Sequence, residues 1–135
     1  MAQATTSNGS SLFMALTLIC VMVVVAQGND GGKAAADSRL WPVGDGAGWS
    51  VGVLGWPNYK PFKAGDVLLF SYKHGAHNVV QVNTVAQYSM CEVPRNATVW
   101  SSGNDRITLA RGMSFFVCGI PGHCQKGMKI AVTAR

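Results

Sequence analysis

Short apolar segments that end at turn residues are the feature that most limits how this chain can fold. No segment after residue 40 keeps the periodicity of a long helix, and only residues 83–89 could form a short one. The segments that resemble strands are residues 40–43, 49–53, 67–72, 78–82, 98–101, 106–109, 113–118 and 128–133. Strands of this length and spacing predict an all-β fold, an antiparallel sandwich or barrel of seven to eight strands with short helical segments.

The N-terminal part of the chain contains one long apolar run, residues 12–26. It is shorter than the roughly 20 residues that a membrane span needs. We therefore interpret residues 1–27 as a secretory signal peptide. The cleavage position stays open because a second run of small residues, of the kind that precedes a cleavage site, ends at Ala36. An uncleaved anchor is the alternative, because residues 1–11 lack Lys and Arg. Residues 28–39 are then a flexible lead-in, and residues 40–135 form one domain.

The chain is basic, with 11 Lys and Arg against 6 Asp and Glu and a net charge of +5. Its positive residues are scattered, which argues against a nucleic-acid surface, but the charge favours attraction to an anionic cell-wall polysaccharide. Asn96 begins a glycosylation sequon. The residues after Met128 are too few and too polar to signal a glycolipid anchor. We therefore expect a secreted, extracellular monomer without a stable membrane anchor.

The segment from Cys118 to Met128 carries the chemistry, because a thiol, an imidazole and a thioether (Cys118, His123 and Met128) recur at intervals of five residues. On an extended strand, neighbours at this interval would lie about 17 Å apart and could not share a metal ion. Pro121 and Gly122 form a turn dipeptide between the first two, and Gly127 adds a permissive point before the third. The loop is therefore predicted to curl three ligands round one point.

The fourth ligand is expected from another strand. His77 opens the apolar strand 78–82, whereas His74 lies in a turn-like stretch and is interpreted as a solvated loop histidine. Two histidines, a cysteine and a methionine are the ligands of a blue-copper centre, with a weak axial methionine. One copper ion is therefore the expected cofactor. Because protein ligands fill its positions, no site remains open for a substrate, and an enzyme is not expected.

The cysteine count is informative because Cys20 lies in the signal segment and three cysteines remain. If Cys118 binds copper, Cys91 and Cys124 can form a disulfide that pins the ligand loop. Two other interpretations stay open. A zinc site could use Cys91, Cys118, His123 and Cys124, although adjacent ligands would be strained. A catalytic dyad of Cys118 and His123 is also possible, but it lacks an evident orienting group.

Four motifs resemble the phytocyanins, a family of plant cupredoxins. They are Val43-Gly44 with Gly48-Trp49, residues 62–70 (FKAGDVLLF), residues 77–80 (HNVV) and residues 118–132 (CGIPGHCQKGMKIAV). The resemblance covers residues 40–135 and is greatest for the plantacyanin, or basic blue protein, branch. It implies an eight-stranded Greek-key sandwich, a type 1 copper site, a disulfide between Cys91 and Cys124, and electron transfer.

Within the family, Met128 distinguishes this chain from stellacyanin-like members, in which glutamine is the axial ligand. The complete ligand set distinguishes it from early-nodulin-like relatives without copper. The lack of a Pro/Ser-rich tail distinguishes it from uclacyanin-like members. Plantacyanins are associated with the apoplast and reproductive tissues. We also expect Asn78 to tie its strand to the Cys118 loop by a hydrogen bond.

The function that these features predict is transport of single electrons by cycling between Cu(I) and Cu(II). The redox partner is a small molecule or a protein that the sequence does not identify. An alternative is an extracellular signalling or adhesion module of plant reproduction or the cell wall, in which copper is incidental. Copper storage is a third hypothesis.

Overall fold

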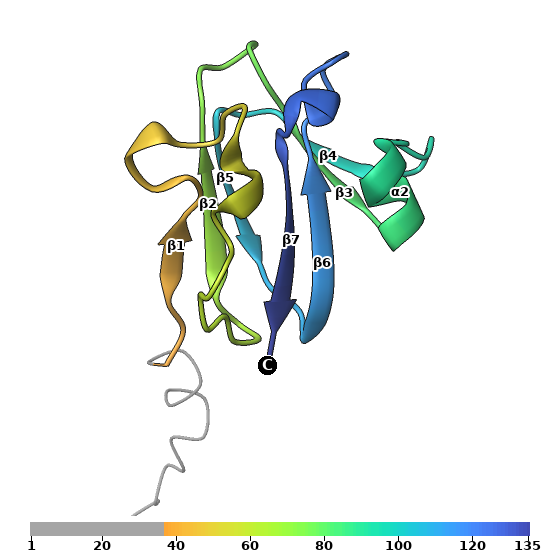
Figure 1. Cartoon of the computed structure of the whole chain (residues 1–135). Coiled ribbons are helices and arrows are strands. Elements are labelled where there is room, and N and C mark those ends of the chain that lie inside the picture. Colours follow the sequence, from red (N-terminus) through yellow and green to blue (C-terminus); the bar gives the residue numbers. More distant parts are fainter. Residues whose placement is uncertain (1–36) are drawn as a thin grey trace, which may run out of the picture.

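The structure is a computed structural model that describes residues 37–135 (Figure 1). The predicted signal peptide at 1–27 and residues 28–36 of the predicted lead-in at 28–39 lie outside the described residues. Within residues 37–135, every helix is too short or too polar to cross a membrane.

Seven strands form two sheets in the described part of the chain, a three-stranded sheet with the order β1-β2-β5 and a four-stranded sheet with the order β4-β3-β6-β7. The strands are β1 (Leu40–Pro42), β2 (Val67–Ser71), β3 (Val79–Val82), β4 (Thr98–Trp100), β5 (Asn104–Thr108), β6 (Gly112–Val117) and β7 (Lys129–Ala134). The helical segments are η1 (Asp45–Ala47), η2 (Val53–Gly55), α2 (Val85–Met90) and η3 (Cys124–Lys126). This arrangement confirms the predicted all-β sandwich with short helices.

Alternation along the strands produces two separate apolar layers. One side of each sheet faces the other sheet, where Leu68 and Phe70 of β2 pack in one core with Phe116 of β6 and Ile130 of β7. A second cluster lies on the opposite side of the four-stranded sheet and is covered by α2. It is built from Val80, Val82, Phe115, Val117 and Cys124, with Tyr88 and Cys91 packed against it. Both disulfide partners therefore belong to this second apolar cluster.

The structure corrects the predicted strand at residues 49–53. Trp49 is buried, and its indole donates a hydrogen bond to the carbonyl of Asn78. However, Gly48 and Gly52 flank this segment with positive φ angles of 69° and 94°, a conformation that interrupts a strand. The chain therefore passes through turns into η2. As a result, the structure has seven strands, where the family resemblance implied eight.

The predicted antiparallel pairing is also wrong at one edge. β1 pairs with β2 in parallel, with Trp41 opposite Leu68, while β2 pairs with β5 in the antiparallel sense. The connection from β1 to β2 is long because it carries η1 and η2, and a parallel neighbour requires such a crossover.

Asp66 joins three segments at the pole where β1 begins. Its buried carboxylate accepts hydrogen bonds from the Arg39 and Lys63 backbone amides, at 2.9 and 3.0 Å, and from the Trp41 indole at 2.9 Å. Burial alone would raise the pKa of Asp66, but these three hydrogen bonds outweigh it and place its pKa below the ordinary value. The charged form is therefore favoured by folding.

We expect Asp66→Asn to destabilise the metal-free protein by about 1.5–3 kcal/mol at neutral pH, since an amide turns an NH₂ group toward donors. Because the folded pKa is lowered, this stabilisation is complete above the ordinary pKa and disappears as the pH falls through the folded pKa. Urea unfolding from about pH 7 down to about pH 2.5 should therefore show the difference shrinking. Asp45→Asn is the matched control, because Asp45 accepts a single exposed indole hydrogen bond from Trp56. Equal losses for the two variants would contradict the assigned role.

Candidate metal centre

His77 lies two residues before β3, in a loop that follows β2. Its backbone forms an isolated bridge with His74, and the turn between them is closed by a hydrogen bond from the Ala76 amide to the Lys73 carbonyl. The Tyr72 ring lies edge-on to the His77 ring, with centroids 6.3 Å apart. The ligand histidine is therefore held on both its backbone and its side chain.

Tyr72 is itself fixed from the neighbouring strand β5. Its hydroxyl donates to the buried carboxylate of Asp105, which also accepts from the backbone amide and the hydroxyl of Ser102. Burial and the hydrogen bond with Asp105 raise the pKa of Tyr72 to about 12. Tyr72 is therefore a neutral hydrogen-bond donor across the physiological pH range, and its ring stays in place against the His77 ring. Sequence reasoning missed this network, and a tyrosine five residues before His77 was the only local signal for it.

Cys118 follows the last residue of β6 and is buried. Its amide donates to the Met128 carbonyl at 3.0 Å, so the start of β7 holds the ligand loop at its base. The side chain of Asn78 accepts a 2.6 Å hydrogen bond from the Gly119 amide, which confirms the predicted tie between the two loops. A Cβ atom at Gly119 would lie 2.9 Å from the Val80 side chain and 3.1 Å from that Asn78 oxygen. This close approach requires a glycine, a constraint that the sequence alone did not indicate.

The loop from Cys118 to Met128 bends back as predicted. The His123 amide donates to the Ile120 carbonyl across Pro121 and Gly122, and Gly122 has a φ of 83°. η3 then carries the chain to Gly127, whose φ is 98°, and the Met128 amide returns to the His123 carbonyl at 3.1 Å. Residues five apart in sequence are thus brought to a common region.

The predicted disulfide between Cys91 and Cys124 is confirmed, and Cys118 is the free cysteine of the described residues. This bond overturns the zinc interpretation, because two of its four supposed ligands are bonded to each other. Cys91 follows α2, so the disulfide ties the residue next to His123 to the helix that covers the four-stranded sheet.

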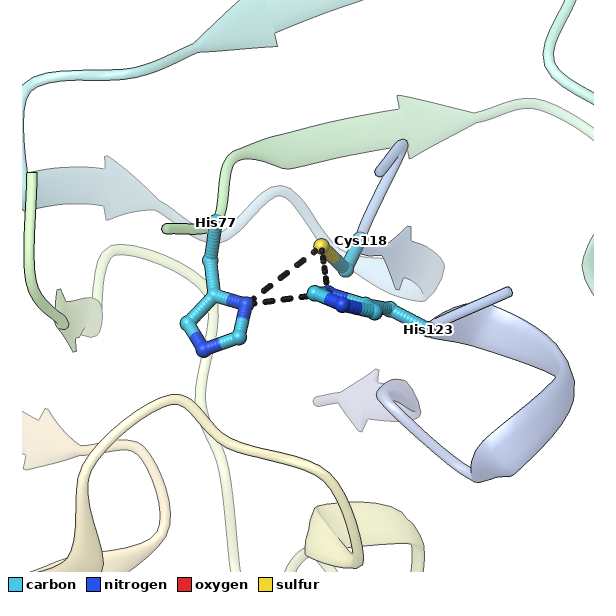
Figure 2. Close-up of side chains that lie close together, drawn as sticks. All are labelled: His77, Cys118 and His123. Atoms are coloured by element: carbon cyan, nitrogen blue, oxygen red, sulfur yellow. Dashed lines mark hydrogen bonds between the residues drawn. The ribbon is translucent and has the colours of Figure 1, made fainter. Parts of the chain in front are cut away.

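The donor atoms of His77, Cys118 and His123 converge on one point (Figure 2). The Nδ1 atoms of His77 and His123 lie 3.0 Å apart, and the Cys118 Sγ is 3.5 Å from the second of these and 4.0 Å from the first. Metal bonds are about 2.0–2.1 Å to nitrogen and 2.3 Å to sulfur, so donors that share an ion can lie up to about 4.4 Å apart. All three separations are within this bound. His74, as predicted, is not part of the cluster.

The chemistry of these donors fits copper. Burial and the neighbouring His123 hold the pKa of His77 below its ordinary value, so its imidazole offers a lone pair at neutral pH. Imidazole nitrogen with thiolate sulfur suits both oxidation states of copper. Met128 is fully buried at the base of the loop, with its backbone bonded to both Cys118 and His123. Met128 is therefore placed to be the fourth ligand, beside His77, Cys118 and His123.

Comparisons with known proteins agree with this geometry. Residues 49–128 match the family described as the plastocyanin-like domain. The chain is 52% identical over 99 residues to a chemocyanin of Lilium longiflorum, covering 73% of this chain and 78% of that protein. It is 43% identical over 134 residues to a basic blue protein of Arabidopsis thaliana, covering 99% of each. The chain belongs to the phytocyanins.

The solved structure of cucumber basic protein, a blue copper protein, matches this phytocyanin with a TM-score of 0.69 and 49% identity, over 71% of this chain and 99% of that one. The family, the fold class and the copper cofactor predicted from the sequence are therefore confirmed. His77, Cys118, His123 and Met128 are arranged as a type 1 copper site. The phytocyanin is a blue copper protein and not an enzyme, which removes the Cys118–His123 dyad as an interpretation.

Proposed function

We propose that this phytocyanin is a secreted carrier of single electrons. The observation that carries the proposal is the convergence of His77, buried Cys118 and His123 on one point, with Met128 at its base. When bound there, copper supplies a reversible one-electron exchange between Cu(I) and Cu(II). The protein fills the strong positions itself and leaves none for a substrate.

The residues of the site contribute rigidity. Cys118 and Met128 share a backbone hydrogen bond, His123 is held within the same loop, and Asn78 ties this loop to the strand after His77. These contacts do not involve the ligand atoms, so they persist whatever the charge of the ion. Ligands that hardly move between two oxidation states favour fast electron exchange. The ligand loop is thus suited to a carrier more than to a store, which must release its metal.

Secretion is supported by two features. Residues 12–26 have the length and composition of a signal-peptide core. The disulfide between Cys91 and Cys124 is of a kind that persists in oxidising compartments. We propose that the protein acts outside the cell, in the apoplast or cell wall, and exchanges electrons with a small molecule or a protein there. Asn96 is proposed to carry a glycan in that compartment.

Voltammetry of the copper-loaded protein tests the carrier function, and we expect a reversible one-electron wave. Met128→Leu should keep the wave and raise the reduction potential, because losing a weak axial donor disfavours Cu(II) more than Cu(I). We expect a shift of some tens of millivolts, where about 59 mV is a tenfold change in the one-electron equilibrium.

Met113→Leu is the matched control for this measurement, because Met113 is an exposed methionine of β6. Its substitution should leave the potential unchanged. An irreversible wave in the unmodified protein, with slow self-exchange, would argue against electron transport. Equal shifts for the two methionine variants would argue against an axial role for Met128.

A further inference from the structure

Two adjacent hollows lie at the pole of the sandwich remote from the copper ligands. One, of about 320 Å³, is lined in part by Tyr59, Lys60 and Arg135. The other, of about 190 Å³, is lined in part by Arg39 and Lys63. Pro61 lines both hollows, so they adjoin along residues 59–63. We call these two hollows together the basic groove.

The basic groove is well separated from the copper site. Met128 directly precedes β7, whereas Arg135 directly follows it. Seven residues of extended chain span about 23 Å at 3.3 Å per residue. Figure 1 shows the C-terminal end of β7 and the start of β1 at one pole, and η3 at the other. A ligand in the basic groove would therefore leave the copper pole accessible.

The cations of the basic groove are held in ways that keep their charge available. The Arg39 guanidinium lies 4.0 Å from the centre of the Trp41 ring. The Lys60 ammonium donates to the Trp56 carbonyl at 2.6 Å and lies over the Trp56 ring. Asp37 and Asp66 also line the groove, where four cations outnumber these two acidic residues, and the Asp66 carboxylate already accepts three hydrogen bonds. These contacts favour an anionic ligand, which a net charge of +5 also attracts.

Tyr59 adds an aromatic surface to the groove. Its side chain is fully exposed, at 104% of the reference accessibility, so the fold gains no burial from it. Its φ is 63°, which is unfavourable for a bulky residue and costs on the order of 1–2 kcal/mol. A strained backbone that presents a fully solvated ring points to a role in binding. An aromatic ring with a polar tip suits a ligand that has both apolar and hydrated polar surfaces, such as a sugar ring.

We propose that the basic groove binds an acidic oligosaccharide, with carboxylates on Lys60, Arg135, Arg39 and Lys63 and one sugar ring on Tyr59. The choice of a saccharide rests on the secretion proposed above, since it places the groove among extracellular polyanions. Bound in this way, the carrier would be retained on an anionic matrix with its copper pole turned outward.

The test is calorimetric titration of the copper-loaded protein with a defined oligogalacturonate. Lys60→Gln combined with Arg135→Gln should weaken binding by about tenfold or more, which is about 1.4 kcal/mol. The control variant, Lys73→Gln with Arg95→Gln, removes the same charge from exposed residues outside the groove. It should change binding by less than about threefold. Equal losses in both double variants would mean diffuse attraction and would overturn the proposal.

Tyr59→Asn separates a ligand role from a structural one. Asn tolerates a positive φ better than Tyr, so this variant should keep or raise the melting temperature while binding weakens severalfold. Unchanged binding would overturn the role of Tyr59. Single-stranded DNA or anionic vesicles that bind as tightly as the oligogalacturonate, and equally in Tyr59→Asn, would overturn the saccharide assignment. The reduction potential of each variant is measured in parallel, so a failure of the groove is distinguished from a failure of the electron-carrier proposal.

Discussion

His77→Ala is expected to weaken copper binding by more than about a hundredfold and to remove the intense blue colour of the copper-loaded protein. Changes to groups that only orient metal ligands typically cost 10–100-fold in affinity, so loss of a ligand should cost at least about as much. His77 supplies one of the three donor atoms at the site, and its Nδ1 lies 3.0 Å from that of His123. Copper titration followed by visible absorption and metal analysis measures both effects.

His74→Ala is the matched control, because His74 lies three residues earlier in the same loop and is paired with His77 only through its backbone. It should keep both the affinity and the colour. Free imidazole can enter the space left by His77→Ala and should restore part of the blue absorption, which shows that a ligand, and not the fold, was lost. A blue His77→Ala protein with unchanged affinity would exclude the site as described. A colourless His77→Ala protein that kept the biological effect would favour a signalling or adhesion role.

The strands were largely predictable because alternation reflects a physical requirement at each position. Leu68 and Phe70 of β2 alternate with more exposed residues, and the pattern in β7 places Ile130 and Val132 on the buried side. The same rule failed at residues 49–53, where Trp49 and Val53 are both buried although the chain is not a strand. Two buried residues four positions apart are compatible with a strand and also with a series of turns. Here Gly48 and Gly52 have positive φ angles and the chain turns. A glycine in the sequence does not reveal this, because glycine adopts positive and negative φ angles about equally well.

The metal ligands were predictable because their chemistry is rare and three of them are close in sequence. Spacing, a turn dipeptide and a short count of histidines were enough to select Cys118, His123 and His77. The supports behind them were harder to foresee. Tyr72 and Asp105 meet across 33 residues because β2 pairs with β5, and strand pairing over that distance leaves no local pattern. Gly119 is required by the approach of Val80 and Asn78, which also depends on pairing between β3 and β6.

The second large effect is expected from removing the disulfide with Cys91→Ala and Cys124→Ala together. The bond joins residues separated by 33 positions. In the chain-entropy account, closing a loop of that length stabilises the folded protein by roughly 3–4 kcal/mol. Urea unfolding of the metal-free variant should show a loss of this size. Both cysteines are replaced together because a single substitution would leave a free Cys124 thiol beside His123, which could compete for the metal.

The same variant should also bind copper more weakly, and this second effect tests what the disulfide does for the site. Cys124 follows His123 and begins η3, while Cys91 directly follows α2, the helix that covers the four-stranded sheet. Without the bond, His123 is held by backbone hydrogen bonds within its own loop, such as the one from its amide to Ile120, and the loop by the tie from Gly119 to Asn78. Ordering that loop must then be driven by metal binding, which lowers the apparent affinity. In the absence of metal, reducing agent should reproduce the loss of stability in the unmodified protein and change nothing in the double variant. A variant that is less stable but binds copper unchanged would show that the disulfide supports the sandwich and that the ligand loop is ordered without it.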